Sequence, residues 1–174
     1  MIIMKENISF IEGNIFHTDM QTIAITVNCK GVMGKGIALD MKKKVPDAYD
    51  EYRNLCKEGK MKIGQPVIYD KELDVLNGKK LLFFPTKNHW RNKSDLLEIR
   101  KGLEWFVEHY EDMGIESIAF PALGCGHGGL SWDGVKPLME KFLKELDIEI
   151  EIYPPGTVDK KSLSEKKNLE THYQ

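Results

Sequence analysis

Two glycine-rich segments of the sequence have the composition of anion-binding loops. The first spans residues 28–36 and holds three glycines, and the second spans residues 121–130 and holds four glycines within six positions. Glycine reaches positive φ and lets backbone N–H groups close on an anion, but neither segment matches the GxxxxGK[ST] or GxGxxG nucleotide patterns. We therefore expect the two segments to hold a diphosphate through backbone amides. The alternative for either segment alone is a connection that binds nothing.

A third segment, residues 85–94, concentrates cations around a tryptophan. Lys87 directly follows an apolar run, and a lysine whose proton affinity is lowered by burial and by nearby cations is a candidate amine nucleophile. Trp90 lies beside Arg91 and Lys93, a combination that suits the phosphates and bases of a nucleic acid. The alternatives are a solvated surface lysine and a tryptophan packed against the adjoining helix.

Short apolar runs and amphipathic patterns predict the elements that must position these segments. Runs bounded by Gly or Pro predict strands, and apolar residues at steps of three and four predict helices. Strands are predicted at 8–12, 23–28, 67–69, 81–84, 117–120 and 148–153, and helices at 36–44, 47–58, 96–110 and 132–146. Pro85 and Pro121 are expected to stop two strands. Ser94 and Ser131 are expected to cap helices, and Gly59 to end one.

This alternation of strands and helices predicts an α/β fold with a mostly parallel sheet covered on both faces. In such sheets, ligands bind beyond the carboxyl ends of the strands. The residues that follow Val27, Phe84 and Phe120 should therefore meet at one edge of the sheet.

Composition excludes several classes of protein. The chain has 174 residues, 25 Lys and Arg against 27 Asp and Glu, and a net charge of −2, which excludes a polycation that holds nucleic acid by bulk charge. Its three cysteines have no C-x-x-C spacing, so we expect no disulfide scaffold, no metal site and a reducing cytoplasm. The early charges exclude a signal peptide, and no apolar run is long enough to span a membrane. Residues 157–174 read as a polar, lysine-rich tail.

At this point the sequence resembles the macrodomain family, which binds ADP-ribose on a three-layer α/β/α sandwich with a central mixed, mostly parallel sheet. The resemblance runs from about Ile8 to Pro155, which implies a macrodomain at residues 1–156. It implies that 13–15 contacts adenine, that the 28–36 segment surrounds the distal ribose and that the 121–130 segment binds the phosphates. The ADP-ribose-binding residues implied are Gly13, Asn14, Ile15, Asn28, Val32, Met33, Gly34, Lys35, Gly36, Pro121, Leu123, Gly124, Cys125, Gly126, His127, Gly128, Gly129 and Leu130.

Within that family, Val-Met-Gly-Lys-Gly-Ile-Ala and Phe-Pro-Thr-Lys-Asn-His-Trp-Arg are most similar to the DarG-type DNA ADP-ribosyl glycohydrolases. The resemblance implies hydrolysis that removes ADP-ribose from bases in DNA, thymidine being the expected base, with Lys87 as the catalytic lysine. Related hydrolases of ADP-ribosylated Glu and Asp have an acidic residue where this sequence has Gly128. DNA contacts are expected at His89, Trp90, Arg91 and Lys93, and no cofactor is expected.

Three alternatives remain beside DNA repair. They are a hydrolase of ADP-ribosylated Glu or Asp in proteins, a non-catalytic ADP-ribose-binding module, and removal of phosphate from ADP-ribose 1″-phosphate. DarG also carries a second domain that restrains its toxin. Because 174 residues leave little room for one, we expect an antitoxin-like enzyme that acts on ADP-ribosylated DNA without capturing a toxin.

Overall fold

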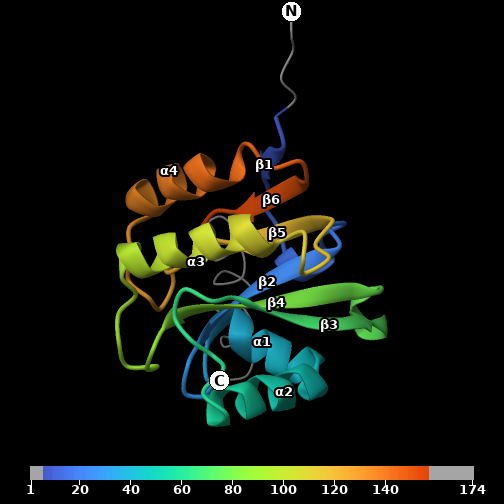
Figure 1. Ribbon diagram of the computed structural model, residues 1–174, viewed down its shortest axis with the longest axis vertical. Coiled ribbons are helices and arrows are strands. Elements are labelled where there is room, and N and C mark those ends of the chain that lie inside the picture. The colour runs from blue at the N-terminus through green and yellow to red at the C-terminus, as the bar shows by residue number, and fades with distance from the viewer. Residues whose placement is uncertain (1–5, 157–174) are drawn as a thin grey trace, which may run out of the picture.

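Residues 6–156, the part of the chain that the computed structural model describes, alternate between strands and helices as the sequence predicts (Figure 1). The strands are β1 (Ile8–Phe10), β2 (Thr22–Asn28), β3 (Val67–Leu73), β4 (Lys79–Lys87), β5 (Ser117–Pro121) and β6 (Glu149–Tyr153). The α-helices are α1 (Gly36–Lys44), α2 (Pro46–Lys57), α3 (Leu96–His109) and α4 (Trp132–Leu143). Two 3₁₀ helices, η1 (Ile15–His17) and η2 (Asp74–Leu76), complete the order.

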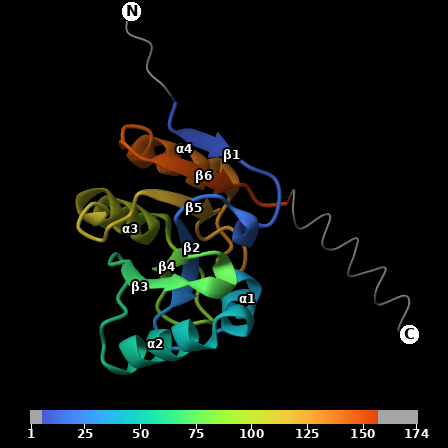
Figure 2. The ribbon, with the colours of Figure 1, turned by 90° about the vertical axis from the view of Figure 1, so that its right-hand side faces the viewer.

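The strands form one sheet in the order β1-β6-β5-β2-β4-β3. Every neighbouring pair runs parallel except β3 and β4, which run antiparallel. Helices α1 and α2 cover one face and α3 and α4 the other, as Figures 1 and 2 show. The predicted three-layer α/β/α sandwich with a mixed, mostly parallel sheet is therefore confirmed.

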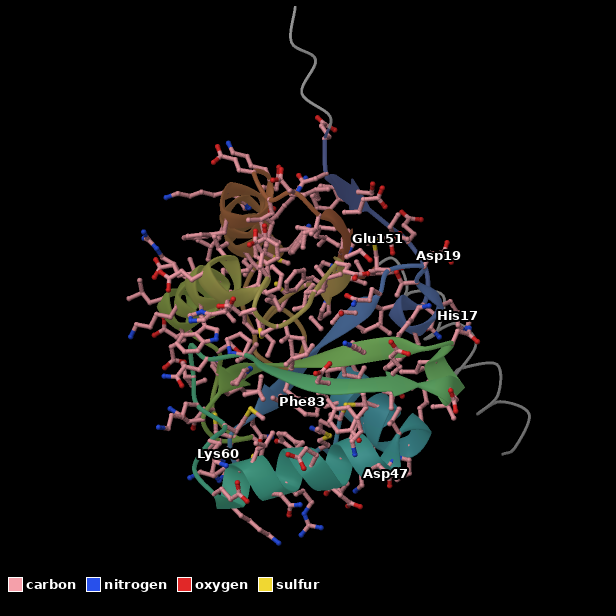
Figure 3. The ribbon with its side chains drawn as sticks, turned by 45° about the vertical axis from the view of Figure 1, so that its right-hand side comes forward. His17, Asp19, Asp47, Lys60, Phe83 and Glu151 are labelled. Carbon is pink, nitrogen blue, oxygen red and sulfur yellow. The ribbon has the colours of Figure 1, made fainter. Side chains whose placement is uncertain are left out.

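Alternating side chains of the central strands build a core on each face of the sheet. In β2, Ile23 and Ile25 pack on the side of α1 and α2, whereas Ala24 packs on the side of α3 and α4. In β4, Phe83 and Phe84 divide between the faces in the same way, and Figure 3 shows Phe83 between the sheet and α2. These strands read as continuous apolar runs because both of their faces are buried.

Most element ends agree with the sequence, and one predicted cap is wrong. Gly59 follows α2 at φ 70°, where a glycine favours the left-handed turn, and Pro121 is the last residue of β5. Ser131 is the N-cap residue of α4. The N-cap of α3 is Asp95 rather than Ser94, because the Asp95 carboxylate accepts a hydrogen bond from the N–H of Leu97.

Pro85 does not stop β4, contrary to the prediction. A proline has no N–H to give to a neighbouring strand, so it is tolerated where no ladder bond is required. Strand β3 begins at Val67, opposite Phe83, and so provides no partner at Pro85. On the other side, the pairing with β2 shifts register between Val27 and Asn28 beside the proline. Strand β4 therefore continues for two residues beyond Pro85.

A partly buried carboxylate ties the segment after η1 to β6. The hydroxyls of Thr18 and Tyr153 both donate to one oxygen of Glu151, which Figure 3 labels. Burial is the main reason that the pKa of Tyr153 rises to about 12. The Tyr153 hydroxyl therefore stays protonated and remains a donor to Glu151.

No helix among residues 6–156 is long and apolar enough to cross a membrane. The expected tail, 157–174, lies outside the described residues, so the boundary after residue 156 stays a prediction.

Gly102→Ala is expected to destabilise the protein, because a Cβ at Gly102 of α3 would lie 2.6 Å from the ring of Phe84 in β4. Overpacking of this kind costs about 1–3 kcal/mol and outweighs the roughly 1 kcal/mol by which alanine favours a helix. Urea unfolding measures the change. Gly134→Ala in α4 is the matched control, because nothing lies within 4 Å of its Cβ and stability should stay equal or rise. Equal stability of the two variants would contradict the close packing of α3 on β4.

Candidate functional site

The parallel strands β2, β4 and β5 bring the three chemically interesting segments to one edge of the sheet. Asn28 at the end of β2 pairs with Lys87 at the end of β4, and the N–H of Cys29 donates to the carbonyl of Lys87 at 3.1 Å. The Lys87 Nζ lies 3.4 Å from the carbonyl oxygen of Trp90 and 3.4 Å from that of His127. The predicted convergence of the 28–36, 85–94 and 121–130 segments is therefore present.

Asn28 holds the 28–36 segment in shape. Its Nδ2 donates to the carbonyl of Val32 at 2.7 Å, and its Oδ1 accepts from the N–H of Lys30 at 2.9 Å. The hydroxyl of Tyr52 lies 2.8 Å from the carbonyl and 2.9 Å from the Oδ1 of Asn28. Only one N–H of the Asn28 amide is left for a ligand, so the main role of this side chain is to shape the loop.

Tyr52 is a residue of the site that the sequence did not reveal. It belongs to the apolar stripe of α2 and is 0% exposed, so its pattern is that of a core residue. Burial raises the pKa of Tyr52 well above its ordinary value, which keeps the hydroxyl a donor to Asn28. Only the packing of α2 beneath the end of β2 gives Tyr52 this function.

Three of the predicted binding residues anchor their segments instead of presenting a side chain. Ile15 and Met33 are 8% and 3% exposed and belong to the core on the side of α1 and α2. Leu123 is 0% exposed and belongs to the core on the other face. Only the backbone of these three residues is available to a ligand. Other residues of the two glycine segments are exposed, namely Gly34, Lys35, Gly36, Gly126 and His127.

The two glycine segments contain backbone N–H groups without hydrogen-bond partners, most of them on exposed residues. Within residues 6–156, the N–H groups of Gly34, Lys35 and Gly36 have no hydrogen-bond partner, and neither do those of Gly126, His127 and Gly128. A Cβ placed on Gly36 would lie 3.5 Å from the His127 ring, so the two segments touch there. Free backbone N–H groups of this kind, one set of them at the N-terminus of α1, are donors suited to an anion such as a diphosphate.

Gly128 has no room for a side chain. A Cβ there would overlap Ser94 Oγ and would lie 2.5 Å from the carbonyl oxygen of Gly124. The N–H of Ser94 donates to the carbonyl of Gly128 at 2.9 Å, which joins the 85–94 and 121–130 segments. Among the described residues, Ser94 Oγ is the single buried side-chain oxygen or nitrogen without a hydrogen-bond partner. An acidic residue at position 128 would require these segments to separate.

The three segments are electropositive although the chain is not. Together they contain five Lys or Arg residues and no Asp or Glu, in a chain whose net charge is −2. Lys87 is partly buried, and burial followed by the charge of Lys35 lowers the pKa of its amine. Burial raises the pKa of the Cys125 thiol to about 11, which disfavours a thiolate. The neutral amine is the nucleophilic form of a lysine and the neutral thiol is the weakly nucleophilic form of a cysteine, so both shifts favour Lys87 over Cys125 as the candidate nucleophile.

Trp90 faces solvent, with 44% of its surface exposed, and is not packed into the adjoining helix. The Arg91 guanidinium lies 4.5 Å from the centre of its ring, and the His89 ring lies 4.9 Å from it. Lys93 is exposed and lies beside Gly129, since its Cδ would be 4.0 Å from a Cβ placed on that glycine. Trp90 therefore lies next to Lys87 through its backbone carbonyl, and His89 and Arg91 lie against its indole. Lys93 lies beside the 121–130 segment.

Gly13 and Asn14 lie further along the same edge of the sheet. They follow β1, which is two strands from β5, a separation of about 10 Å at the usual strand spacing. The Asn14 Oδ1 accepts from the N–H of Phe16 at 3.0 Å and so caps η1. Asn14 is exposed, and its NH₂ group stays available to a ligand that reaches this far.

Comparison with known proteins gives a consistent set of relatives. A family model described as Macro domain matches residues 25–139. A DNA ADP-ribosyl transferase-DNA ADP-ribosyl glycohydrolase fusion protein of Thermosipho africanus is 44% identical over 166 residues, which cover 87% of this chain and 43% of that protein. A DNA ADP-ribosyl glycohydrolase of Thermus aquaticus is 37% identical and is covered to 41% of its length. The chain thus spans about two fifths of the length of these relatives.

A solved structure, Thermosipho africanus DarTG in complex with ADP-ribose, matches with a TM-score of 0.82 at 42% identity, covering 87% of this chain and 43% of that one. The macrodomain of Mycobacterium tuberculosis DarG matches with a TM-score of 0.81 at 38% identity. In that case 86% of this chain and 98% of the solved chain are covered. The described fold is therefore shared with both structures.

Gly128→Ala is expected to lower the free energy of unfolding by about 1–3 kcal/mol, because the new methyl group must displace Ser94 or the Gly124 carbonyl. Gly126→Ala is the matched control from the same segment, since nothing lies within 4 Å of its Cβ. Its stability should change by less than about 0.5 kcal/mol. Thermal or urea unfolding of both variants gives the comparison, and a Gly128→Ala protein as stable as the control would show that the loop contact is not as described.

Proposed function

The chain belongs to the macrodomain family, and we propose that it is a DNA ADP-ribosyl glycohydrolase that removes ADP-ribose from bases in DNA, thymidine being the expected base. The observation that carries the proposal is the position of Lys87. Its amine lies 3.4 Å from the carbonyl of His127, within one set of free backbone donors, and is affected by the charge of Lys35 from the other set. The three segments around it contain cations and no Asp or Glu. The two relatives named above carry this activity in their names. The proposed place of action is the cytoplasm.

The free donors suit the diphosphate of ADP-ribose. We place the diphosphate between Gly34–Gly36 and Gly126–Gly128, where six N–H groups lack partners among the described residues. The distal ribose then lies over Gly34 and the end of β2, beside Lys87. The adenosine extends toward Gly13 and Asn14, along the roughly 10 Å that separates β5 from β1.

Lys87 acts as the nucleophile in this proposal. A neutral amine has two N–H bonds and one lone pair, and two carbonyl oxygens lie 3.4 Å from Nζ to accept the hydrogens. The lone pair is then free to attack C1″ of the distal ribose. A bond forms between Nζ and C1″ while the C1″–N bond to the base breaks. The base nitrogen keeps the electron pair and takes up a proton, and water later releases ADP-ribose and restores the lysine.

Removal of the Lys87 amine should abolish hydrolysis and leave binding nearly intact. With a thymidine oligonucleotide ADP-ribosylated on its base, Lys87→Ala is expected to lower kcat at least about 1000-fold, because the variant lacks the amine that attacks C1″. Calorimetry should give an ADP-ribose affinity within a few-fold of wild type, since the backbone donors are unchanged. Lys57→Ala, at the exposed end of α2, is the control.

Other outcomes of the same assay would redirect the proposal. Full activity of Lys87→Ala would end the lysine mechanism. Turnover on an ADP-ribosylated protein with none on DNA would favour the hydrolase of modified Glu and Asp. Tight ADP-ribose binding with no turnover on any substrate would favour a binding module.

The pH dependence of the rate follows from the need for a neutral amine. The rate should rise about tenfold per pH unit and level off at the pKa of Lys87, which lies below its ordinary value of 10.5 because of burial and of Lys35. Lys35→Met removes one of these two causes, so the pKa of Lys87 rises. The pH at which the rate levels off should then be higher than in wild type. Lys30→Met, from the same segment, should not move it. A pH profile that is the same for wild type and Lys35→Met would count against a titrating Lys87.

A further inference from the structure

We infer that Trp90 is a stacking platform for the nucleobase next to the modified one, so that the enzyme recognises a DNA strand through an aromatic ring beside Lys87. This inference rests on the proposed function and deepens it. Its central observation is that a large aromatic ring remains exposed at the rim of the site, one contact away from the reactive amine.

The position of Trp90 fits the neighbouring nucleotide better than the modified one. Its backbone carbonyl oxygen lies 3.4 Å from the Lys87 Nζ, so Trp90 lies beside the position where C1″ is proposed to react. The modified base is bonded to C1″ and therefore lies at Nζ itself. The Trp90 side chain is exposed beside this point, so we expect the next base along the strand to be the group that meets it. Every base has a flat face, so stacking of this kind tolerates any neighbouring sequence.

The turn that carries Trp90 is already ordered. The N–H of Asn92 donates to the carbonyl of His89 at 3.0 Å, and the N–H of Arg91 donates to the His89 Nδ1 at 3.0 Å. The His89 ring also lies against the indole, with 34° between the ring planes. A ring held in this way loses little freedom when a base stacks on it, so more of the stacking energy appears as affinity.

The charges around the indole match a nucleic-acid strand. The Arg91 guanidinium lies over the ring, 4.5 Å from its centre. Since Arg91 is exposed, a base can take its place on the ring and free the guanidinium for a backbone phosphate. Lys93 lies on the side of Gly129, and the 85–94 segment contains no Asp or Glu. An aromatic face between cations is the arrangement that binds single strands.

The test compares two substrates that differ only in the presence of neighbouring nucleotides. One is ADP-ribosylated thymidine as a nucleoside, and the other is the same thymidine inside a short oligonucleotide. We expect Trp90→Ala to lower kcat/KM on the oligonucleotide about 5- to 150-fold, the range expected for loss of one base stack, and to change the nucleoside rate less than twofold. Trp90→Phe keeps an aromatic ring and should recover most of the kcat/KM on the oligonucleotide. Trp105→Ala removes an indole stacked on His109 of α3, outside the three segments, and is the control.

An abasic residue beside the modified thymidine gives a second measurement. The wild-type kcat/KM on the abasic oligonucleotide should fall to that of Trp90→Ala on the complete oligonucleotide. Trp90→Ala itself should have the same kcat/KM on both oligonucleotides. Equal losses on nucleoside and oligonucleotide would show that Trp90 only supports Lys87, and no loss on either would show that it contacts nothing. Both results would overturn the inference.

The failure of the inference can be told apart from the failure of the proposed function. If wild type hydrolyses neither substrate, the proposed function fails, and Trp90 is then tested by binding of the unmodified oligonucleotide alone. Weaker binding by Trp90→Ala than by wild type would keep the stacking platform, whereas equal binding would overturn it. Stronger binding of an acidic peptide than of the oligonucleotide would assign the surface to a protein partner and overturn it as well.

Discussion

The parallel pairing of β2 with β4 and with β5 is the constraint on which the site depends. Because the strands run in the same direction, their carboxyl ends lie together, and the segments that follow them have to share one edge of the sheet. The pairing of Asn28 with Lys87 places the lysine at the last paired position of the sheet edge, beside the first glycine segment. The buried hydroxyl of Tyr52 then fixes Asn28 and, through it, the shape of the first glycine segment. The chemistry of the site is thus a consequence of backbone pairing and of one hydrogen-bonded tyrosine.

Glycine serves two different purposes at this edge. At Gly128 a side chain is excluded because Ser94 and the Gly124 carbonyl occupy its space, so the glycine allows two segments to pack against each other. At Gly126 nothing lies within 4 Å, so the glycine leaves open space above the free N–H groups. The first purpose is structural, and the second suits a ligand that approaches the backbone closely. A glycine count cannot separate these purposes, because both produce the same sequence.

Electrostatics at the site is local. The whole chain is close to neutral, yet five cations and no carboxylate occupy the three segments. Partial burial at the end of β4 and the neighbouring charge of Lys35 act in the same direction on the amine of Lys87 and favour its neutral form. The same cations suit the phosphates of a nucleotide and of a strand. One arrangement of charge therefore serves both the proposed nucleophile and the proposed substrate.

The sequence by itself determined the order of the elements, the two cores and the edge at which the site lies. Local patterns were sufficient here, because strand alternation and helical periodicity are properties of neighbouring residues, and α1 at 36–44 was predicted to the residue. Only the tertiary structure decided that Asp95 caps α3 in place of Ser94, that β4 continues through Pro85, and that Tyr52 and Ser94 belong to the site. The Asp95 cap has a local partner, Leu97, but the neighbouring Ser94 donates its N–H to the carbonyl of Gly128, far along the chain. The course of β4 through Pro85 depends on the edge of a neighbouring strand, and Tyr52 and Ser94 depend on partners more than 20 positions away. Such contacts arise only when the whole sheet is assembled, and no local pattern encodes them.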